Sequence, residues 1–543
     1  MTSKIALLVQ GLWELSDSVG YDCISEYRLL KRLLPEDSEV RVFSDVFDAA
    51  RYPDVDISAA RNLSAWLAAN PDATLIYHWS DGWPDINRGL ADMGVRTVIR
   101  WHNSTPPWFF APYSPGLAGA GVRGYGALLR IAGARHVEFW VNSDFTARQL
   151  AFLGVEDARI HVVFPLSPFL DKDAEAPSPA ATRPMPADDG TAPLRLLFVG
   201  RAVPHKGHKH ILAAAARVQE RLGRPVAVDM PGRADPDMAL YVTESLGLAK
   251  RLGVRARMDG EASFAEIRRL YDAADVFVCL SEHEGFGLPI FEAMRAGLPV
   301  VGLRSTAIGD FLAAHPLGVD EMDHDAIAAR IAAAADPAIR RAVNAWQRAN
   351  ILAHYTPAIV EAQIAAGLAG SHSRAGMPVR RDEALERTVA AALPRAAHTR
   401  THVADLGRDT TDRFVTRHDL RSYEALFARI ADVTPEPRAD TLYNHLWRSA
   451  FPRGSRPLSG FWRLVRRQAM SLNFGLVAAV EQSRRETSEE ISALRRQIAE
   501  LKESVEMSVS RTGPEAGRNS RRKVAASQAD GRPGSLPGPG SKV

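Results

Sequence analysis

The chain has 543 residues, a formal net charge of +3 and two cysteines. This length exceeds what one hydrophobic core usually supports, so two sizeable domains with additional segments are expected. No apolar run approaches the roughly 18 to 20 residues that a membrane-spanning helix requires. Cys23 and Cys279 lie far apart with no His or Cys at ligand spacing, which indicates neither a disulfide framework nor a thiolate metal site.

The first apolar run, Ile5 to Leu12, is short and leads into Glu14 and Asp17 without a small-residue cleavage pattern. It predicts a first β-strand rather than a signal peptide, and we expect the protein in the cytoplasm.

Residues 1–170 alternate short β-branched or apolar runs with helical stretches. This alternation predicts a Rossmann-like domain with a parallel sheet and crossover helices. The further predicted strands are Val40–Ser44, Thr74–His78, Thr97–Trp101, Val137–Asn142 and Ile160–Phe164.

Residues 171–193, rich in Pro, Ala, Asp and Thr, predict a linker, and a second Rossmann-like domain follows over 194–345. Two doubly wound α/β domains that face one another leave a cleft at the carboxyl ends of their strands, where such sheets bind ligands. The second series has predicted strands at Leu194–Val199, Val226–Met230, Arg255–Met258, Val276–Leu280 and Pro299–Val301, and predicted helices at Ile211–Leu222 and Phe264–Ala273.

The remaining chain is helical and then polar. Residues 346–370 predict a helical crossover, and 371–487 predict a basic helical C-terminal extension. Residues 488–510 carry apolar positions at alternating spacings of three and four, which predicts a short coiled coil. Residues 511–543, rich in Gly, Pro, Ser and Arg, predict a disordered tail. From residue 371 onward there are thirty Lys and Arg against twenty Asp and Glu, so the basic surplus belongs to this part.

The most informative motif follows the predicted strand Val276–Leu280 and reads SEHEGFGLPIFE from Ser281 to Glu292. It predicts a strand, a glycine loop and a helix that begins near Pro289. The backbone amides of Gly285, Phe286, Gly287 and Leu288 then lie at a helix N-terminus, which favours a phosphate. Glu284 and Glu292 would reach different hydroxyls of one extended ligand, such as a sugar and a ribose.

A second motif, FVGRAVPHKG from Phe198 to Gly207, follows the first strand of the second domain. Arg201 and Lys206 lie on the strand-to-helix loop and offer a guanidinium and an ammonium to a diphosphate. These cations would stabilise the charge that develops when a nucleoside diphosphate leaves an anomeric carbon. Such a site can operate without a metal.

Together the two motifs resemble family 4 of the retaining glycosyltransferases, whose fold is GT-B. Residues 200–207 are similar to its diphosphate loop. The segment from Glu284 to Glu292 is similar to its signature, in which seven residues separate two glutamates. The resemblance covers roughly residues 1–370. It implies that Arg201 and Lys206 hold the donor diphosphate, that Glu284 contacts the donor sugar, and that Glu292 contacts the ribose.

The resemblance extends to three further positions. Gly20 falls where the family has a glycine loop near the nucleotide. His102 falls where the family often has a histidine near the transferred sugar, so Glu284 and His102 are the predicted catalytic residues. Asp310 stands in a segment where the family has a Pro-Glu pair, which puts that contact in doubt. The resemblance implies no cofactor besides the nucleotide-sugar donor, and no metal.

Several features have two interpretations. His205, His208 and His210 suggest a metal, but their lysine neighbours favour a solvated basic loop. The aromatic segments 77–83 and 101–110 fit either sugar stacking or internal packing.

The C-terminal segments also have two interpretations. Residues 441–475 are basic and aromatic, and they fit either a helix on anionic lipid or a helix docked on the enzyme. No nucleic-acid module accompanies the charge. Residues 488–510 fit either self-association or a solvated helix.

The resemblance, together with the basic C-terminal part, therefore implies an enzyme of bacterial cell-surface glycan biosynthesis, such as that of lipopolysaccharide or exopolysaccharide. It would transfer a hexose, such as mannose or glucose, from a nucleoside-diphosphate sugar to a polysaccharide or lipid-linked oligosaccharide. The reaction is expected in the cytoplasm or at the inner face of the cell membrane. The alternatives are a sugar-nucleotide epimerase of the same fold and a non-catalytic scaffold for glycan assembly.

Overall fold

The computed structural model describes residues 3–13, 17–106, 109–110, 112–167, 192–371 and 380–393. Beyond residue 371 the described part contains one helix, α15 (Glu383–Ala392). Most of the predicted linker, the basic stretch 441–475, the predicted coiled coil 488–510 and the predicted disordered tail 511–543 lie outside the described residues.

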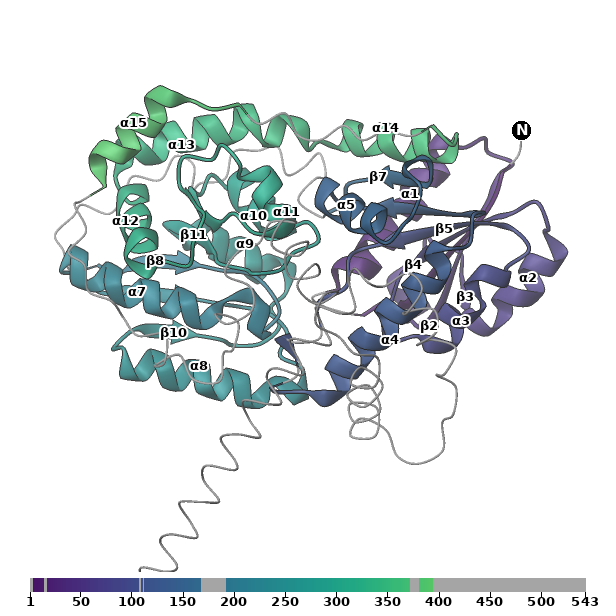
Figure 1. Ribbon diagram of the computed structural model, residues 1–543, viewed down its shortest axis with the longest axis horizontal. Coiled ribbons are helices and arrows are strands. Elements are labelled where there is room, and N and C mark those ends of the chain that lie inside the picture. Colours follow the sequence, from purple (N-terminus) through teal and green to yellow (C-terminus); the bar gives the residue numbers. More distant parts are fainter. Residues whose placement is uncertain are drawn as a thin grey trace, which may run out of the picture. The chain divides into compact units, whose positions relative to one another are not determined.

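The first half of the described chain forms a seven-stranded parallel sheet with the order β3-β2-β1-β4-β5-β6-β7. Figure 1 shows this sheet in purple and blue. Its strands are β1 (Lys4–Gly11), β2 (Glu39–Val46), β3 (Ile57–Ala59), β4 (Thr74–His78), β5 (Arg96–Trp101), β6 (Val137–Val141) and β7 (Ile160–Val162). Its helices are α1 (Ser18–Leu33), α2 (Leu63–Ala69), α3 (Pro84–Gly89), α4 (Pro115–Ala132) and α5 (Asp144–Phe152), with short 3-10 turns at Ala49–Arg51, Ala60–Asn62, Leu90–Asp92 and Asp157–Arg159.

The second half repeats the same topology in a six-stranded parallel sheet with the order β10-β9-β8-β11-β12-β13. Its strands are β8 (Leu194–Leu197), β9 (Val226–Asp229), β10 (Arg255–Arg257), β11 (Val276–Cys279), β12 (Val300–Leu303) and β13 (Gly318–Val319). Its helices are α7 (His208–Leu222), α8 (Ala239–Arg251), α9 (Phe264–Ala273), α10 (Leu288–Arg295), α11 (Thr306–Phe311), α12 (His324–Ala334) and α13 (Pro337–Asn350), with 3-10 turns at Pro204–Lys206, Pro236–Met238 and Leu352–His354.

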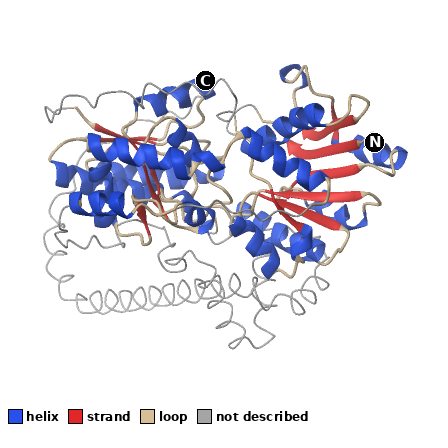
Figure 2. Cartoon of the chain, turned by 90° about the horizontal axis from the view of Figure 1, so that it is seen from above, coloured by secondary structure: helices blue, strands red, loops and turns tan. Residues whose placement is uncertain are grey.

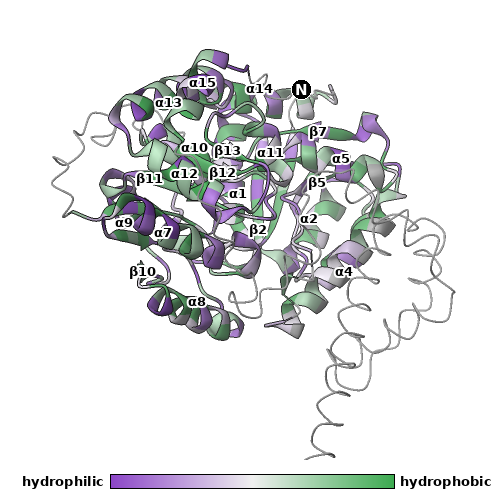
Figure 3. Ribbon diagram, turned by 60° about the vertical axis from the view of Figure 1, so that its left-hand side comes forward, coloured by the Kyte–Doolittle hydropathy of each residue, from purple (hydrophilic) through white to green (hydrophobic). Residues whose placement is uncertain are grey.

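Helices cover both faces of each sheet, as Figure 2 shows with red strands between blue helices. A strand covered on both faces needs apolar side chains at successive positions rather than alternate ones. All four residues of β11, Val-Phe-Val-Cys, are buried accordingly. In Figure 3, hydrophobic residues (green) predominate along the strands, whereas α7 and α8 carry both hydrophobic and hydrophilic residues. The predicted pair of doubly wound α/β domains is therefore confirmed.

Each sheet has a point at which the strand order reverses, between β1 and β4 in the first sheet and between β8 and β11 in the second. In doubly wound sheets, ligands bind outside the carboxyl ends of the strands at such points. The loops that carry Lys206 and Glu284 follow β8 and β11 directly. The fold thus brings both predicted donor motifs to one switch point.

Helix α14 (Pro357–Leu368) leaves the second half and contacts the first sheet. Arg96 donates from Nη1 to the carbonyl of Leu368 at 2.8 Å, and the amide of Phe164 donates to Oε1 of Gln363 at 2.9 Å. Among the described residues, no helix combines the length and hydropathy needed to cross a membrane.

Candidate active site

The loop after β8 is tied to the loop after β11 by its backbone. The amide of Glu282 donates to the carbonyl of His205 at 2.7 Å. Gly207, which caps the N-terminus of α7, has a φ of +71°, and a Cβ at this position would overlap the carbonyl oxygen of Leu280. Glycine is therefore required at position 207 both for its conformation and for the close approach of the two loops.

The two loops also meet through their charged side chains. Lys206 donates from Nζ to Oε1 of Glu284 at 2.5 Å, and the two side chains are only 17% and 11% exposed. Because little water reaches the two side chains, their charged hydrogen bond is stronger than that of an exposed ion pair and fixes their relative positions more firmly. Two residues that the sequence placed in separate motifs are thus in direct contact.

Arg201 is paired with a carboxylate that the sequence did not assign to the donor site. Its Nη2 donates to Oδ2 of Asp235, and Arg233 contacts the other carboxylate oxygen of Asp235 from Nε at 3.0 Å. The guanidinium of Arg233 also lies 5.8 Å from the ring centroid of Trp13, which is 45% exposed. Arg201 thus shares one acidic partner with a second arginine that sequence reasoning missed.

The glycine loop is held from both halves of the described chain. The amide of Glu284 donates to Oγ1 of Thr306 at 2.9 Å. On the other side, Oγ of Ser143 donates to the carbonyl of Gly285 at 2.9 Å. A Cβ at Gly285 would overlap the carbonyl oxygen of His102, so only glycine fits between the two halves at this point.

Helix α10 begins directly after Gly287, which has a φ of +93° and caps the helix without a side chain. The amides of its first turn are the groups that could bind a phosphate. The side chain of Phe286 is buried and stacks on Phe291 with ring centroids 4.7 Å apart. Phe286 therefore offers only its backbone to a ligand, while Leu288 is half-buried at the start of the helix.

Both carboxylate oxygens of Glu292 accept hydrogen bonds inside the protein. Ser167 donates from Oγ to Oε1 at 2.9 Å, and Tyr271 donates from its hydroxyl to Oε2 at 3.0 Å. Burial raises the pKa of Glu292 to about 7, although both hydrogen bonds favour the charged form. Glu292 is consequently poised to change its protonation state near neutral pH.

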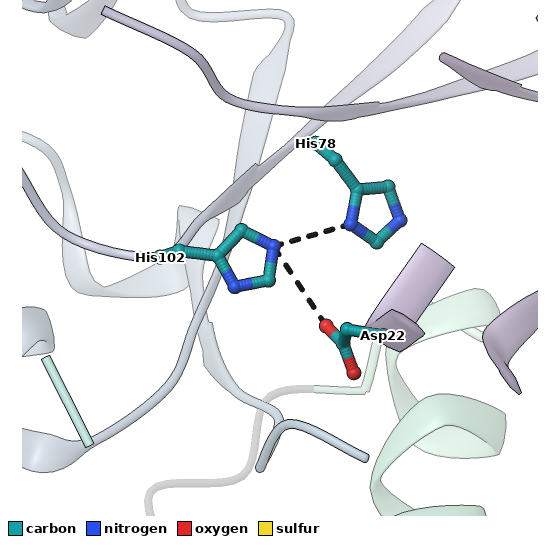
Figure 4. A group of neighbouring side chains, drawn as sticks. All are labelled: Asp22, His78 and His102. Atoms are coloured by element: carbon teal, nitrogen blue, oxygen red, sulfur yellow. Dashed lines mark hydrogen bonds and ion pairs between the residues drawn. The ribbon is translucent and has the colours of Figure 1, made fainter. Parts of the chain in front are cut away.

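His102 follows β5 and lies beside the buried side chains of Asp22 on α1 and His78 at the end of β4 (Figure 4). Its Nε2 is 3.1 Å from Nδ1 of His78 and 3.7 Å from Oδ2 of Asp22. Burial lowers the pKa of His102 well below its ordinary value, and Arg100 and His78 lower it further. Within the described part of the chain, Asp22, His78 and His102 are close enough together to serve as metal ligands.

Gly20 lies in the first turn of α1, where its amide donates to Oδ1 of Asp17 at 2.8 Å. A Cβ at Gly20 would overlap the carboxylate of Asp17. The helix cap therefore explains this glycine by itself, and its role near the nucleotide stays a prediction.

The expectation of a solvated basic loop around His205, His208 and His210 is wrong. All three histidines are buried, and burial lowers the pKa of His208 to about 3. Lys209 between them is 1% exposed, and its Nζ donates to Glu244 at 3.0 Å and to the hydroxyl of Tyr113 at 3.0 Å. The lysine led to the prediction of an exposed loop. Inside the protein, however, the Glu244 carboxylate and the rings of Tyr113 and Tyr241 stabilise the Lys209 ammonium.

Most of the aromatic side chains proposed as sugar platforms pack in the interior instead. Tyr77, Trp79 and Trp101 are buried, as are Phe109 and Phe110. Of the two interpretations, internal packing therefore accounts for these five side chains.

Comparison with known proteins agrees with the geometry of the second half. Residues 189–343, which contain both loops, match the family model described as "Glycosyl transferases group 1". This part of the chain is therefore similar to a glycosyltransferase group 1 domain. The match does not distinguish family 4, so membership of that family stays a prediction.

The chain is also similar to curated glycosyltransferases. It is 31% identical over 202 residues to D-inositol 3-phosphate glycosyltransferase from Mycobacterium tuberculosis (strain H37Ra) and from Mycobacterium bovis (strain BCG / Pasteur 1173P2). Each match covers 34% of this chain and 40% of the relative. The chain thus spans less than half the length of these relatives.

Solved structures show the same fold as both halves of the described chain. Anabaena HepE in complex with UDP and glucose is 18% identical with a TM-score of 0.51, over 68% of this chain and 99% of HepE. Sucrose-phosphate synthase from Thermosynechococcus elongatus is 19% identical with a TM-score of 0.52, over 68% of this chain and 98% of that chain. The two parallel-sheet domains are therefore a GT-B fold.

Proposed function

We propose that the protein is a retaining glycosyltransferase of family 4 that moves a hexose from a nucleoside-diphosphate sugar to a glycan acceptor. The observation that carries this proposal is the contact between Lys206 and Glu284 at the switch point of the second sheet. A cation for a phosphate and a carboxylate for a sugar hydroxyl meet there, inside the segment that is similar to a glycosyltransferase group 1 domain.

In the proposed reaction, Arg201, Lys206 and the amides of residues 285–288 bind the diphosphate. The bond between the anomeric carbon and the diphosphate oxygen breaks, and its electron pair stays on the diphosphate. An acceptor hydroxyl forms the new bond on the same face of the sugar and gives its proton to the departing phosphate oxygen. Fixed cations and amides stabilise the leaving group more in the transition state than in the ground state, which accelerates the reaction without a metal or other cofactor.

The two glutamates and His102 orient the rest of the donor. Glu284 would accept a hydrogen bond from a hydroxyl of the hexose, and Glu292 would accept from the ribose in place of Ser167. His102 lies beside the glycine loop, since its carbonyl meets Gly285. The glycine at position 20 would leave room for the nucleotide near the start of α1.

The proposed acceptor is a polysaccharide or lipid-linked oligosaccharide of the bacterial cell surface, glycosylated in the cytoplasm or at the inner face of the cell membrane. Residues 441–475 would contact the anionic lipid there, and residues 488–510 would associate with a partner or with a second copy. The names of the similar proteins support UDP-glucose as the first donor to test, because HepE binds UDP and glucose.

The test is to incubate the full chain with UDP-glucose or GDP-mannose, with and without a lipid-linked oligosaccharide. We expect sugar transfer to depend on Lys206 and Glu284. Loss of one charged hydrogen bond costs roughly 1.5–3 kcal/mol, so Lys206→Met and Glu284→Gln should each lower kcat/KM by about 10- to 150-fold. The exposed residues Lys250 and Glu220 provide matched controls as Lys250→Met and Glu220→Gln.

Three outcomes would contradict the proposal. An isomerised donor without a glycosylated acceptor would indicate an epimerase. Wild-type turnover in both site variants would show that the assigned residues do not bind the donor. Binding of neither nucleotide sugar would favour a scaffold role.

A further inference from the structure

Thr306, the first residue of α11, has a backbone conformation that threonine rarely adopts. Its φ is +46°, and among the described residues Asn103 is the only other non-glycine residue with a positive φ. For a β-branched residue this left-handed conformation is strained, because Cβ comes too close to the following carbonyl oxygen. Thr306 is also buried. Such strain persists only where the surrounding structure holds the residue in place.

The loop after β12 holds the loop after β11 through two hydroxyl side chains. Oγ1 of Thr306 accepts from the amide of Glu284 at 2.9 Å, and the amide of Ala307 donates to the carbonyl of Glu284 at 3.4 Å. One residue earlier, Ser305 donates from Oγ to the carbonyl of Ser281. The backbone of the donor loop is therefore fixed at both ends of the segment 281–284.

The rest of α11 packs on the glycine loop that follows Glu284. A Cβ at Gly287 would lie 3.3 Å from Cγ1 of Ile308, so the helix is in close contact with the loop at this point. Further along, the ring of Phe311 meets that of Phe286 edge-on, with centroids 5.0 Å apart. Helix α11 thus supports the donor loop along its length, and Thr306 is the position where this support reaches Glu284.

A glycine at position 306 would adopt the same backbone without strain. Two other positions of the donor site with a positive φ are indeed glycines, namely Gly207 at +71° and Gly287 at +93°. Glycine has no hydroxyl, however, and would leave the amide of Glu284 without its acceptor. The threonine therefore combines a strained backbone with the one side-chain oxygen that bonds to Glu284, which indicates that this bond matters for the donor loop.

The position of the Glu284 backbone determines where its carboxylate lies. That carboxylate is hydrogen-bonded to Lys206 and is only 11% exposed, so it has little room to adjust if the backbone moves. A misplacement of about 1 Å is enough to weaken binding and catalysis strongly. Because the amide of Glu284 is already bonded to Thr306, Glu284 offers its side chain to a ligand, and the amides left for a phosphate are those of residues 285–288.

We propose that Thr306 is a positioning residue of the donor site. Its hydroxyl fixes the backbone of Glu284, so that the Glu284 carboxylate stays within reach of both Lys206 and a hydroxyl of the donor sugar. Thr306 acts through Glu284 and does not contact the donor itself. This inference rests on the proposed function, and it adds a residue that neither of the two donor motifs contains.

Three variants of the full chain separate the hydroxyl from the strain. Thr306→Ser keeps the hydroxyl, Thr306→Ala removes it and keeps the strained backbone, and Thr306→Gly removes both. Relief of the strain should give Thr306→Gly a Tm roughly 2–8 °C above that of Thr306→Ala. In isothermal titrations with UDP-glucose and GDP-mannose, both of these variants should nevertheless bind the donor about 2- to 10-fold more weakly than wild type, the effect of one neutral hydrogen bond. Thr306→Ser should bind as wild type does.

Two further measurements accompany the titrations. Hydrogen exchange of peptides that span residues 281–288, measured without ligand, should be faster in Thr306→Ala and Thr306→Gly than in wild type and Thr306→Ser, because the amide of Glu284 loses its acceptor. Thr356→Ala is the matched control. Oγ1 of Thr356 also accepts from a backbone amide, that of Ile359 at 3.4 Å, but Thr356 has an ordinary φ of −127° and caps α14 outside the donor loops. It should lower Tm and leave donor affinity unchanged.

Wild-type donor affinity in both Thr306→Ala and Thr306→Gly would overturn the proposal. So would an equal loss of affinity in Thr306→Ser and Thr306→Ala, since the hydroxyl would then not be the group that matters. If wild type binds neither nucleotide sugar, the proposed function fails and this inference fails with it. That outcome is distinct from the other two, because in those wild type binds the donor and only the order of the variants differs.

Discussion

Replacing Gly207 by alanine tests whether the close approach of the two donor loops builds the site. The left-handed conformation of position 207 costs a non-glycine residue roughly 1–2 kcal/mol. The added methyl group would also overlap the carbonyl oxygen of Leu280, and such overpacking costs a further 1–3 kcal/mol or so. Because backbone cannot rotate away as a side chain can, the loops must separate and Lys206 must move away from Glu284.

Gly223 at the other end of α7 provides the matched control. Its φ is +62°, but a Cβ added there would meet no described atom within 4 Å. Gly223→Ala therefore has the conformational cost alone. For domains of this size, 1 kcal/mol corresponds to roughly 2–4 °C in Tm, so we expect Gly223→Ala to lower Tm by about 2–8 °C and Gly207→Ala to lower it further.

The decisive measurement is donor affinity, obtained by titration with UDP-glucose or GDP-mannose well below either Tm. Gly207→Ala should weaken binding about tenfold or more, whereas Gly223→Ala should bind as wild type does. Equal affinity in both variants would refute the reasoning, since the approach of the loops would then not matter for the donor.

Three further predictions follow from single side chains. Burial raises the pKa of Glu292 from 4.5 to about 7, so the folded chain binds this proton more tightly than the unfolded chain does. The free energy of unfolding therefore falls as pH rises through this range and Glu292 ionises. Glu292→Gln should remove that loss, giving a higher Tm than wild type at pH 8 but not at about pH 4; a parallel pH dependence of both proteins would contradict this. Phe286→Ala should cost about 3–5 kcal/mol and lower Tm strongly, because the ring is buried against Phe291; a small change in thermal unfolding would show that the loop repacks. Arg148→Ala should change Tm by no more than about 2–4 °C, because its pair with Asp310 is partly exposed; a larger shift would indicate that this contact carries more stability.

Most strands of both sheets could be predicted closely because buried parallel strands have continuous apolar sequences; β10, which reads Arg-Ala-Arg, is an exception. The predicted strand Thr74–His78 coincides with β4, and the other runs differ from the observed strands by a few residues. Two strands were not predicted. β3 has three half-buried residues and β13 has two residues, so neither carries a run long enough to recognise.

The donor loops were predictable because each motif is local in sequence and follows a strand. Their partners were not, because Asp235 reaches Arg201 from a different loop, and the side chains beside His102 come from α1 and β4. One signal was present: Asp22 and Glu26 lie four residues apart on α1, among residues that are otherwise buried. Charged residues on the buried face of a helix indicate a partner somewhere in the core.

The bond between Lys206 and Glu284 has a consequence for selectivity. A ligand that engages the ammonium must compete with a carboxylate already bound to it at 2.5 Å. Inorganic phosphate would displace Glu284 and leave that half-buried carboxylate without a replacement, so its affinity should be low. A nucleotide sugar brings a hydroxyl for Glu284 together with the phosphate for Lys206. The site should therefore discriminate against the cell's abundant free phosphate and favour ligands that are long enough to satisfy both residues.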